Sequence, residues 1–255
     1  MDMPINAFKR AILAGERQIG LWSGLGSGTA LEIIAGSGYD WIVIDTEHSP
    51  NELPDVLEGL RAISGGTAMA VVRPAWNDVI LIKRFLDIGA QTLLVPFIQN
   101  AEEASQAVTF MRYPPQGVRG VSVAQRANRY GRIADYFRCV HDELCLLVQL
   151  ETRAALAELE AIVDVEGVDG VFIGPSDLAA NMGHLGNSGH PEVQDAIAEA
   201  YSRCRHLGKP VGILAPLEED AKRYLDMGFT FVAVGSDIGL LRRSSENLLN
   251  AFKKG

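Results

Sequence analysis

The stretch Cys145-Leu146-Leu147-Val148-Gln149-Leu150-Glu151 is almost continuously apolar and ends in an acid. Such a run is too apolar for a strand with one solvated face, and it predicts a buried strand in a parallel sheet covered on both faces. The run Val168–Ile173 has the same character and is followed by Gly174-Pro175-Ser176-Asp177. Because neighbouring strands lie about 4.8 Å apart, Glu151 and Asp177 could converge on one cation. Alternatively, both acids begin helices, where capping and the helix dipole favour them, and the spacing alone does not decide.

Apolar strand-like runs alternate with helical patterns along the chain. The predicted strands are Gln18–Ser23, Asp40–Asp45, Ala68–Arg73, Gln91–Val95, Cys145–Leu150, Asp169–Ile173, Val211–Leu214 and Thr230–Val234. The predicted helices are Asn6–Ala14, which is short and precedes the first strand, and then Thr29–Ala35, Asn51–Ile63, Val79–Ile88, Ala101–Met111, Arg153–Val163, Pro191–Leu207, Glu218–Met227 and Leu240–Phe252. Asp78 is an N-cap candidate, and Gly89, Gly208 and Gly228 follow helix ends.

Eight strand–helix repeats in about 250 residues predict an α/β fold, the (β/α)₈ TIM barrel. Its size fits a single domain over residues 1–255. An open, doubly wound sheet is the alternative, but the glycine-rich dinucleotide fingerprint is missing after the first strand.

The net charge and the residue composition exclude some classes of binding partner. A net charge of −9 argues against nucleic acid or an anionic membrane as the partner, because phosphate binding needs clustered Lys and Arg. No signal-peptide pattern and no membrane-spanning run is recognised, so a cytoplasmic location is expected. Cys139, Cys145 and Cys204 lack a C-x-x-C spacing and are expected to be reduced thiols.

Two joints between predicted elements are unusually long, which often marks function. The first, Tyr113 to Arg132, carries Arg119, Arg126 and Arg129, and the second runs from Asn181 to His190. Both are expected at the face of the barrel that holds active sites. For Arg129 we expect only a solvated role. His184 and His190 are expected to pack the second joint rather than to bind a ligand.

The carboxyl ends of barrel strands share one mouth, and several reactive side chains are expected there. Asp45 and His48 follow the second strand, Arg73 ends the third, and Gln149 lies near the end of the fifth. An arginine suits an anionic oxygen. A histidine beside an aspartate makes a plausible general base. The alternative for Asp45 is that it caps the turn after its strand.

Hard oxygen ligands such as Glu151 and Asp177 favour Mg²⁺ or Mn²⁺. A Schiff-base mechanism would need a lysine inside the barrel. None of the six lysines falls within a predicted strand, the six being Lys9, Lys83, Lys209, Lys222, Lys253 and Lys254. Stabilisation of a carbanion is therefore expected from a metal.

The motifs at these strand ends resemble those of the HpcH/HpaI family of metal-dependent (class II) pyruvate aldolases. The matching segments are Asp45-Thr-Glu-His48, Val72-Arg73-Pro74, Tyr113-Pro-Pro-Gln-Gly-Val-Arg-Gly120, Gln149-Leu-Glu151 and Gly170-Val-Phe-Ile-Gly-Pro-Ser-Asp177. The resemblance implies a homohexamer of barrels that exchange their last helix. It also implies a divalent cation, Mg²⁺, Mn²⁺ or Co²⁺, held by Glu151 and Asp177.

The same resemblance implies the roles of the remaining residues. Pyruvate would chelate the metal near Gln149 and the backbone around Gly174 and Ser176. Arg73 would stabilise the enolate oxygen, and His48, paired with Asp45, would be the base. The implied reaction is reversible retro-aldol cleavage of a 4-hydroxy-2-oxo acid, in which the C4 hydroxyl loses its proton, the C3–C4 bond breaks and an aldehyde leaves.

Different segments of the chain resemble family members that act on two different substrates. The segments Gly120–Asn128, Gly183–Asn187, Gly212–Pro216 and Gly235–Asp237 look closer to members that cleave 2-dehydro-3-deoxyglucarate, which we place ahead. The segments Ala90–Pro96 and Val163–Asp169 are near members that cleave 4-hydroxy-2-oxoheptanedioate.

Three further residues resemble substrate contacts. Leu214 looks like a wall for the aldehyde portion, and Asp87 resembles a residue that reaches a neighbouring subunit's site. Arg126 could bind a distal carboxylate or could order its loop through a salt bridge.

Two other functions are compatible with such a barrel. One is a carbon–carbon lyase acting on a coenzyme A thioester, which should show a basic groove for the nucleotide. The other is a non-catalytic barrel that binds a keto acid. The acidic composition disfavours the first, and the complete set of acids, base and arginine disfavours the second.

Overall fold

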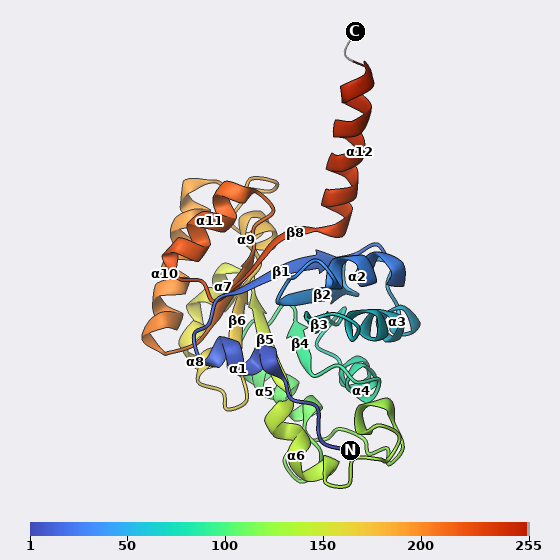
Figure 1. Cartoon of the computed structure of the whole chain (residues 1–255). Coiled ribbons are helices and arrows are strands. Elements are labelled where there is room, and N and C mark those ends of the chain that lie inside the picture. The colour runs from blue at the N-terminus through green and yellow to red at the C-terminus, as the bar shows by residue number, and fades with distance from the viewer. Residues whose placement is uncertain (254–255) are drawn as a thin grey trace.

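The computed structural model describes residues 1–253, and its centre is a closed barrel of eight parallel strands that pair in chain order, with β8 returning to β1 (Figure 1). The strands are β1 (Gln18–Ser23), β2 (Trp41–Asp45), β3 (Met69–Arg73), β4 (Thr92–Val95), β5 (Cys145–Leu150), β6 (Gly170–Ile173), β7 (Val211–Leu214) and β8 (Phe231–Ser236). The predicted barrel class is confirmed, and β5 has the predicted bounds.

Helices surround this barrel, except that the first closes one end of it and the last projects away from it (Figure 1). They are α1 (Ala7–Leu13), α2 (Gly28–Ala35), α3 (Leu53–Ile63), α4 (Val79–Asp87), α5 (Ala101–Met111), α6 (Tyr136–Glu143), α7 (Arg153–Ala157), α8 (Leu159–Val163), α9 (Pro175–Asn181), α10 (Pro191–His206), α11 (Glu218–Met227) and α12 (Asp237–Lys253), with a 3₁₀ turn η1 at Arg126–Asn128. Asp78 caps α4 by accepting from the backbone N–H groups of Ile80 and Leu81, as predicted. The predicted helix 153–163 is broken at Glu158, and α6 and α9 were not predicted.

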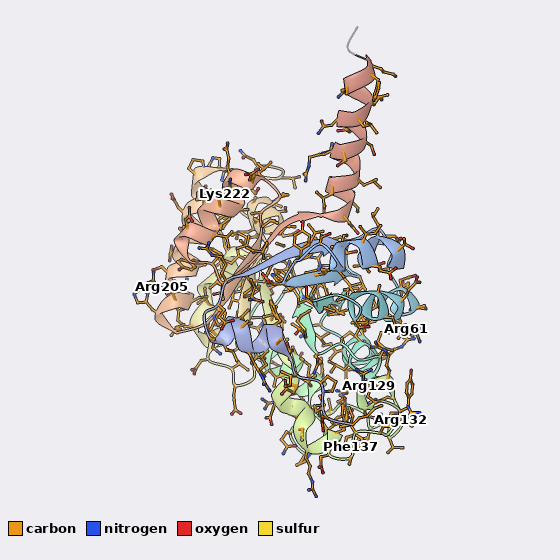
Figure 2. All side chains as sticks on the ribbon, in the orientation of Figure 1. Arg61, Arg129, Arg132, Phe137, Arg205 and Lys222 are labelled. Carbon is orange, nitrogen blue, oxygen red and sulfur yellow. The ribbon has the colours of Figure 1, made fainter. Side chains whose placement is uncertain are left out.

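Two apolar layers hold the fold together. The larger layer lies between the strands and the outer helices. The smaller fills the barrel with rings such as Trp22, Trp41, Phe172 and Phe231. A Cβ on Gly212 would lie 2.1 Å from the Phe231 ring, so glycine leaves the room that this ring needs. Figure 2 shows side chains packed throughout this body, with Arg205 and Lys222 on the outside.

Helix α1 closes the end of the barrel opposite the strand carboxyl ends. Its Phe8 is fully buried, and the Phe8 ring centroid lies 5.5 Å from that of Trp41 and 5.7 Å from that of Phe231. The apolar face of this short predicted helix is thereby buried inside the barrel. The open end is the one that carries the strand carboxyl ends.

The long joint that begins at Tyr113 was expected at the open end, and this expectation is wrong. The segment follows helix α5 and precedes β5, so it belongs to the end where strands begin. Arg126 there donates to the carbonyl of Ile88, just before β4 (2.7 Å). The second joint, Asn181 to His190, follows α9 and does lie at the open end, where Ser188 and Gly189 line a cavity.

Helix α12 projects away from the barrel (Figure 1). Its first residue, Asp237, is buried and accepts hydrogen bonds from the Ser23 hydroxyl (2.8 Å) and the Gly24 backbone (3.0 Å). Several of its apolar side chains are exposed, namely Ile238, Leu240, Leu241, Leu248, Leu249 and Phe252. In residues 1–253, no helix is long and apolar enough to cross a membrane. All three cysteines are free thiols.

Candidate active site

A buried ion pair joins the ends of β2 and β3. The register places Asp45 beside Arg73, and Arg73 donates from Nε to Asp45 Oδ1 (2.8 Å) and from Nη2 to Oδ2 (2.7 Å). The Arg73 guanidinium also lies over the Trp22 ring, 4.7 Å from its centroid. Burial raises the pKa of Asp45, but the hydrogen bonds and charge of Arg73 outweigh it, so the net pKa is lowered. Arg73 is thus held rigidly beside the open end of the barrel.

Glu47 is a site residue that the sequence analysis did not assign. Its Oε2 lies 2.7 Å from Arg73 Nη1, so the guanidinium has a carboxylate on each side. Burial is the main cause that raises the pKa of Glu47, with smaller contributions from the charges of Asp45 and Asp177. The available signal was its position two residues beyond the end of β2.

The expected side-chain pair between His48 and Asp45 is absent, which corrects the predicted dyad. The only hydrogen bond from His48 to Asp45 comes from the His48 backbone N–H (3.4 Å), because Arg73 and Trp22 bind the Asp45 carboxylate. The His48 ring is 64% exposed and its Nε2 lies 3.8 Å from Glu47 Oε1. The alternative for Asp45, that it caps the turn after β2, is observed: its carboxylate accepts from the backbone N–H of Glu47 (2.9 Å). His48 still lines the cavity.

Glu151 lies buried just beyond β5. Its Oε1 accepts from the backbone N–H of Phe97 (2.9 Å), a residue held in the left-handed region at φ 55°, and its Oε2 accepts from the Gln149 side chain. Burial, followed by the charges of Asp177 and Glu47, raises the pKa of Glu151 to about 7. The carboxylates of Asp177 and Glu47 therefore disfavour the charged form of Glu151, although Arg73 offsets part of the charge of Glu47.

A cavity of about 250 Å³ opens over these groups. Its lining includes most of the predicted site residues, namely His48, Arg73, Gln149, Gly174, Ser176, Asp177 and Leu214. Asp177 is in the first turn of α9. Asp177 therefore does begin a helix, as the alternative reading expected, and it also lines the cavity.

The site has the chemistry of a divalent-cation site. Glu151 and Asp177 interact electrostatically, and Oε1 of Gln149 is buried with no hydrogen-bond partner in residues 1–253. A Cβ on Gly174 would lie 2.5 Å from Glu151 Oε2, so the glycine leaves the room that this carboxylate needs. Carboxylate and amide oxygens without cysteine suit a hard cation such as Mg²⁺ or Mn²⁺.

Two predicted contacts lie away from this cavity. Asp87, at the end of α4, accepts from Nη2 of the fully buried Arg119 (2.7 Å). Arg126 is at the opposite end of the barrel, so it does not contact substrate in its own cavity. His184 and His190 stack with ring centroids 3.6 Å apart, and His184 hydrogen-bonds to Glu192 (2.8 Å). The ligand atoms of these three side chains lie within 4.8 Å of one another, close enough to hold a metal ion, so the expectation that the two histidines only pack stays a prediction.

Comparison with known proteins places this arrangement in a family. Residues 18–244 match the model described as "HpcH/HpaI aldolase/citrate lyase". The chain belongs to this family. It is 57% identical to a "Pyruvate aldolase" of Rhizobium etli, with 99% of both chains covered. It is 56% identical to a "4-hydroxy-2-oxo-heptane-1,7-dioate aldolase" of Klebsiella pneumoniae, with 97% of this chain and 94% of the relative covered.

A solved structure agrees with this assignment. The HpcH/HpaI aldolase/citrate lyase family protein of Burkholderia cenocepacia superposes with a TM-score of 0.95 at 37% identity, covering 98% of this chain and all of the other. The expected family is thereby confirmed. With full-length relatives this similar, the protein is an aldolase, a carbon–carbon lyase.

Gly174→Ala is expected to weaken metal binding by this aldolase and to lower its activity at least about tenfold. The added Cβ would overlap Glu151 Oε2 and contact Gln149 Nε2 at 3.0 Å, so both side chains must shift, and misplacement of a catalytic constellation by about 1 Å can cost 10²-fold. Titration with Mn²⁺ and steady-state rates measure the effect. Gly36→Ala is the matched control, because its φ is −79° and its nearest contact is 3.6 Å. Equal behaviour of both variants would contradict the argument.

Metal affinity of the aldolase is expected to fall as pH drops below about 7. The pKa of Glu151 is raised to about 7, so below that pH the metal-free site binds a proton that the cation must displace. The dissociation constant of Mn²⁺ should rise ~tenfold per unit in this acidic range and level off above it. Calorimetry in buffers of different ionisation enthalpy measures the released proton. Glu160→Gln, on the surface, should leave the profile unchanged, and a flat wild-type profile between pH 5.5 and 8 would refute the prediction.

Proposed function

We propose that this aldolase reversibly cleaves a 4-hydroxy-2-oxo acid to pyruvate and an aldehyde with the help of a divalent cation. The observation that carries the proposal is the cavity at the strand carboxyl ends, where Arg73 is fixed by two carboxylates and Glu151 and Asp177 lie nearby. The names of the two relatives, at 57% and 56% identity, support the reaction class.

Glu151 and Asp177 are proposed to hold the cation, Mg²⁺, Mn²⁺ or Co²⁺, with Gln149 beside it. When bound, such a cation acts as a Lewis acid on the keto and carboxylate oxygens of the substrate. Gly174 and the exposed Ser176 leave the backbone of this turn open to a small keto acid. The substrate is thereby oriented with its reacting carbon chain toward Leu214.

Arg73 is proposed to stabilise the enolate oxygen that develops when the C3–C4 bond breaks. Asp45 and Glu47 hold the guanidinium in place before reaction, so little reorganisation is needed in the transition state. His48 is proposed to remove the C4 hydroxyl proton. Its ring lines the cavity and is oriented near Glu47 rather than Asp45.

The proposed substrate is 4-hydroxy-2-oxoheptanedioate rather than 2-dehydro-3-deoxyglucarate. The support is the activity for which the Klebsiella pneumoniae relative is named, since that relative aligns with almost the whole chain. The sequence motifs alone favour the sugar acid 2-dehydro-3-deoxyglucarate. Leu214 is proposed to contact the aldehyde portion.

The deciding experiment measures pyruvate release from both substrates after chelation by EDTA and after resupply of Mg²⁺, Mn²⁺ or Co²⁺. Metal-dependent release, faster from the heptanedioate, is the expected result. Release undiminished by thorough chelation would refute the metal site. No release from either substrate would favour a thioester lyase or a non-catalytic keto-acid-binding barrel.

The assembly is proposed to be a homohexamer in which α12 packs on a neighbouring subunit. The support is the exposed apolar surface of α12, including Leu241, Leu248 and Phe252, on a helix that projects from its own barrel (Figure 1). Asp87 would then face a neighbour's site, and the cytoplasmic location stays a prediction. Light scattering of the full chain tests the hexamer, and a monomer at micromolar concentration would refute it.

A further inference from the structure

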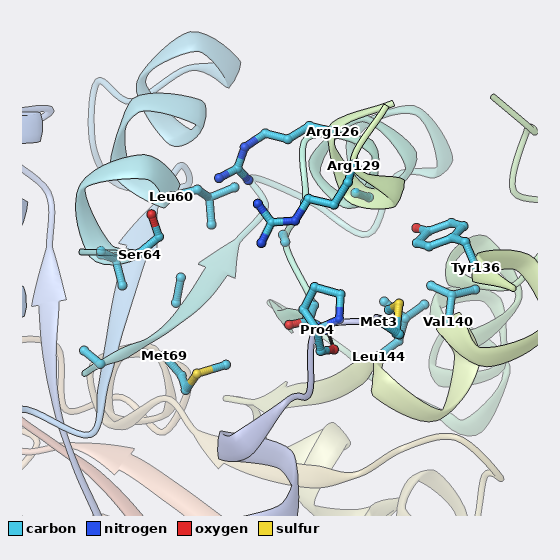
Figure 3. Close-up of a pocket in the computed structure, with 17 residues that line it drawn as sticks. Met3, Pro4, Leu60, Ser64, Met69, Arg126, Arg129, Tyr136, Val140 and Leu144 are labelled. Atoms are coloured by element: carbon cyan, nitrogen blue, oxygen red, sulfur yellow. Dashed lines mark hydrogen bonds between the residues drawn. The ribbon is translucent and has the colours of Figure 1, made fainter. Parts of the chain in front are cut away.

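A second cavity, of about 190 Å³, lies at the opposite end of the barrel from the active site. The end of α3, the starts of β3 and β4, the loop around η1 and the N-terminal segment enclose it (Figure 3). Most of its lining is apolar, namely Met3, Pro4, Leu60, Ile63, Met69 and Ala90, with Tyr136 and Val140 from α6. This cavity shares no lining residue with the active-site cavity.

Two arginines face this apolar cavity side by side. Figure 3 shows the guanidinium groups of Arg126 and Arg129 directed toward Leu60 and Ser64. Neither arginine forms an ion pair with any carboxylate of residues 1–253, although acids outnumber bases by 32 to 23 in the chain. Burial and then the positive charges of Arg129 and Arg61 lower the pKa of Arg126. Cations gathered without a counter-charge favour the binding of an anion.

The chain holds the Arg126 side chain and the backbone at Arg129 in place. Arg126 donates from Nη1 to the Ile88 carbonyl at the end of α4 (2.7 Å), and a Cβ on Gly89 would lie 2.6 Å from that nitrogen. Arg129 follows η1 in the left-handed conformation at φ 55°. The Asn128 side chain braces the turn by donating to the Val123 carbonyl (3.0 Å) and accepting from the Gly131 N–H (2.8 Å).

The N-terminal segment forms one wall of the cavity. The carbonyl of Pro4 accepts from Nε2 of Gln91 (2.7 Å), and Met3 and Pro4 both contact the space. A ligand there would be enclosed by apolar atoms on several sides, with the arginines at one edge. This arrangement suits a molecule with one charged end and one apolar end.

We propose that this cavity binds a small organic acid, with its carboxylate between Arg126 and Arg129 and a compact apolar body against Leu60, Met69 and Ala90. The planar guanidinium matches a carboxylate through paired hydrogen bonds. The apolar lining offers few donors for a second or third anionic oxygen, which disfavours inorganic phosphate. An engineered apolar cavity of about 150 Å³ in another protein binds benzene, so the space here suits a body of about that size.

The test is calorimetric titration of the full chain with benzoate, acetate and inorganic phosphate, with pyruvate and Mg²⁺ present at saturation to fill the active site. The proposal expects one benzoate per chain, bound more tightly than acetate or phosphate. Arg129→Ala and Ser64→Glu should each weaken benzoate binding at least about tenfold, the first by removing a charged donor and the second by adding an acid at the rim. Arg129→Ala breaks no side-chain hydrogen bond within residues 1–253.

Arg138→Ala is the matched control, since it removes the same charge from an 88% exposed side chain on α6 and should bind benzoate like the wild type. Unchanged melting temperatures would show that the variants are folded. The proposal is overturned if benzoate does not bind, if Arg129→Ala binds it equally well, or if phosphate binds as tightly as benzoate.

Discussion

Glu151→Gln is expected to abolish tight binding of a divalent cation and to lower kcat/KM by about 10³-fold. Lewis-acid stabilisation is worth several kcal/mol, and each ~1.4 kcal/mol is a factor of ten in rate. Glutamine has the same shape and can still accept from the Phe97 N–H, so the loop after β4 keeps its contact. Metal analysis of the purified protein and steady-state kinetics at saturating Mn²⁺ measure the two effects.

The thermal stability of the same variant shows whether Glu151 is a metal ligand or a residue that stabilises the fold. Burial raises the pKa of Glu151 to about 7, so at pH 8 its charge destabilises the metal-free fold. The metal-free Gln variant should therefore melt at a higher temperature than the metal-free wild type at this pH. Glu166→Gln is the matched control, because its side chain is 95% exposed. If Glu151→Gln retains metal and full activity, the proposed metal site is wrong.

The barrel was predictable because its signals are local. The apolar run that forms β5 and the helix caps such as Asp78 depend on nearby residues alone, and both are observed as predicted. The start of α12 was predicted three residues late, at Leu240. Its actual start, Asp237, is fixed by Ser23 and Gly24, which lie more than 200 residues earlier in the chain. Such a contact leaves no periodic signal in the sequence.

The sequence predicted which residues lie at the strand ends of the active site, but not which side chains pair with one another there. Asp45 and Arg73 were both expected at the open end, yet His48 was expected to bind Asp45. The parallel register of β2 and β3 instead brings Arg73 against Asp45, and a charged guanidinium with two aligned donors binds the carboxylate in place of the imidazole. Arg126 was misplaced because its joint follows a helix rather than a strand.

Arg73→Lys is expected to reduce kcat by ~10²–10³-fold while leaving metal binding intact. The lysine keeps the positive charge but lacks the rigid fork that binds Asp45 through two nitrogens and reaches Glu47 with a third. It also loses the stacking on Trp22. Loss of one pre-oriented donor to a developing oxyanion has an effect of this size in other enzymes.

The pattern of kinetic effects distinguishes this role from simple substrate binding. If Arg73 acts on the enolate in the transition state, kcat and kcat/KM should fall together, because ground-state binding changes little. A rise in KM with unchanged kcat would instead assign Arg73 to binding and refute the proposed role. Arg205→Lys, on the outer surface, is the matched control and should have wild-type kinetics. Mn²⁺ titration of Arg73→Lys should give a wild-type stoichiometry, since Glu151 and Asp177 are unchanged, and a lost metal would show that Arg73 organises the metal site as well.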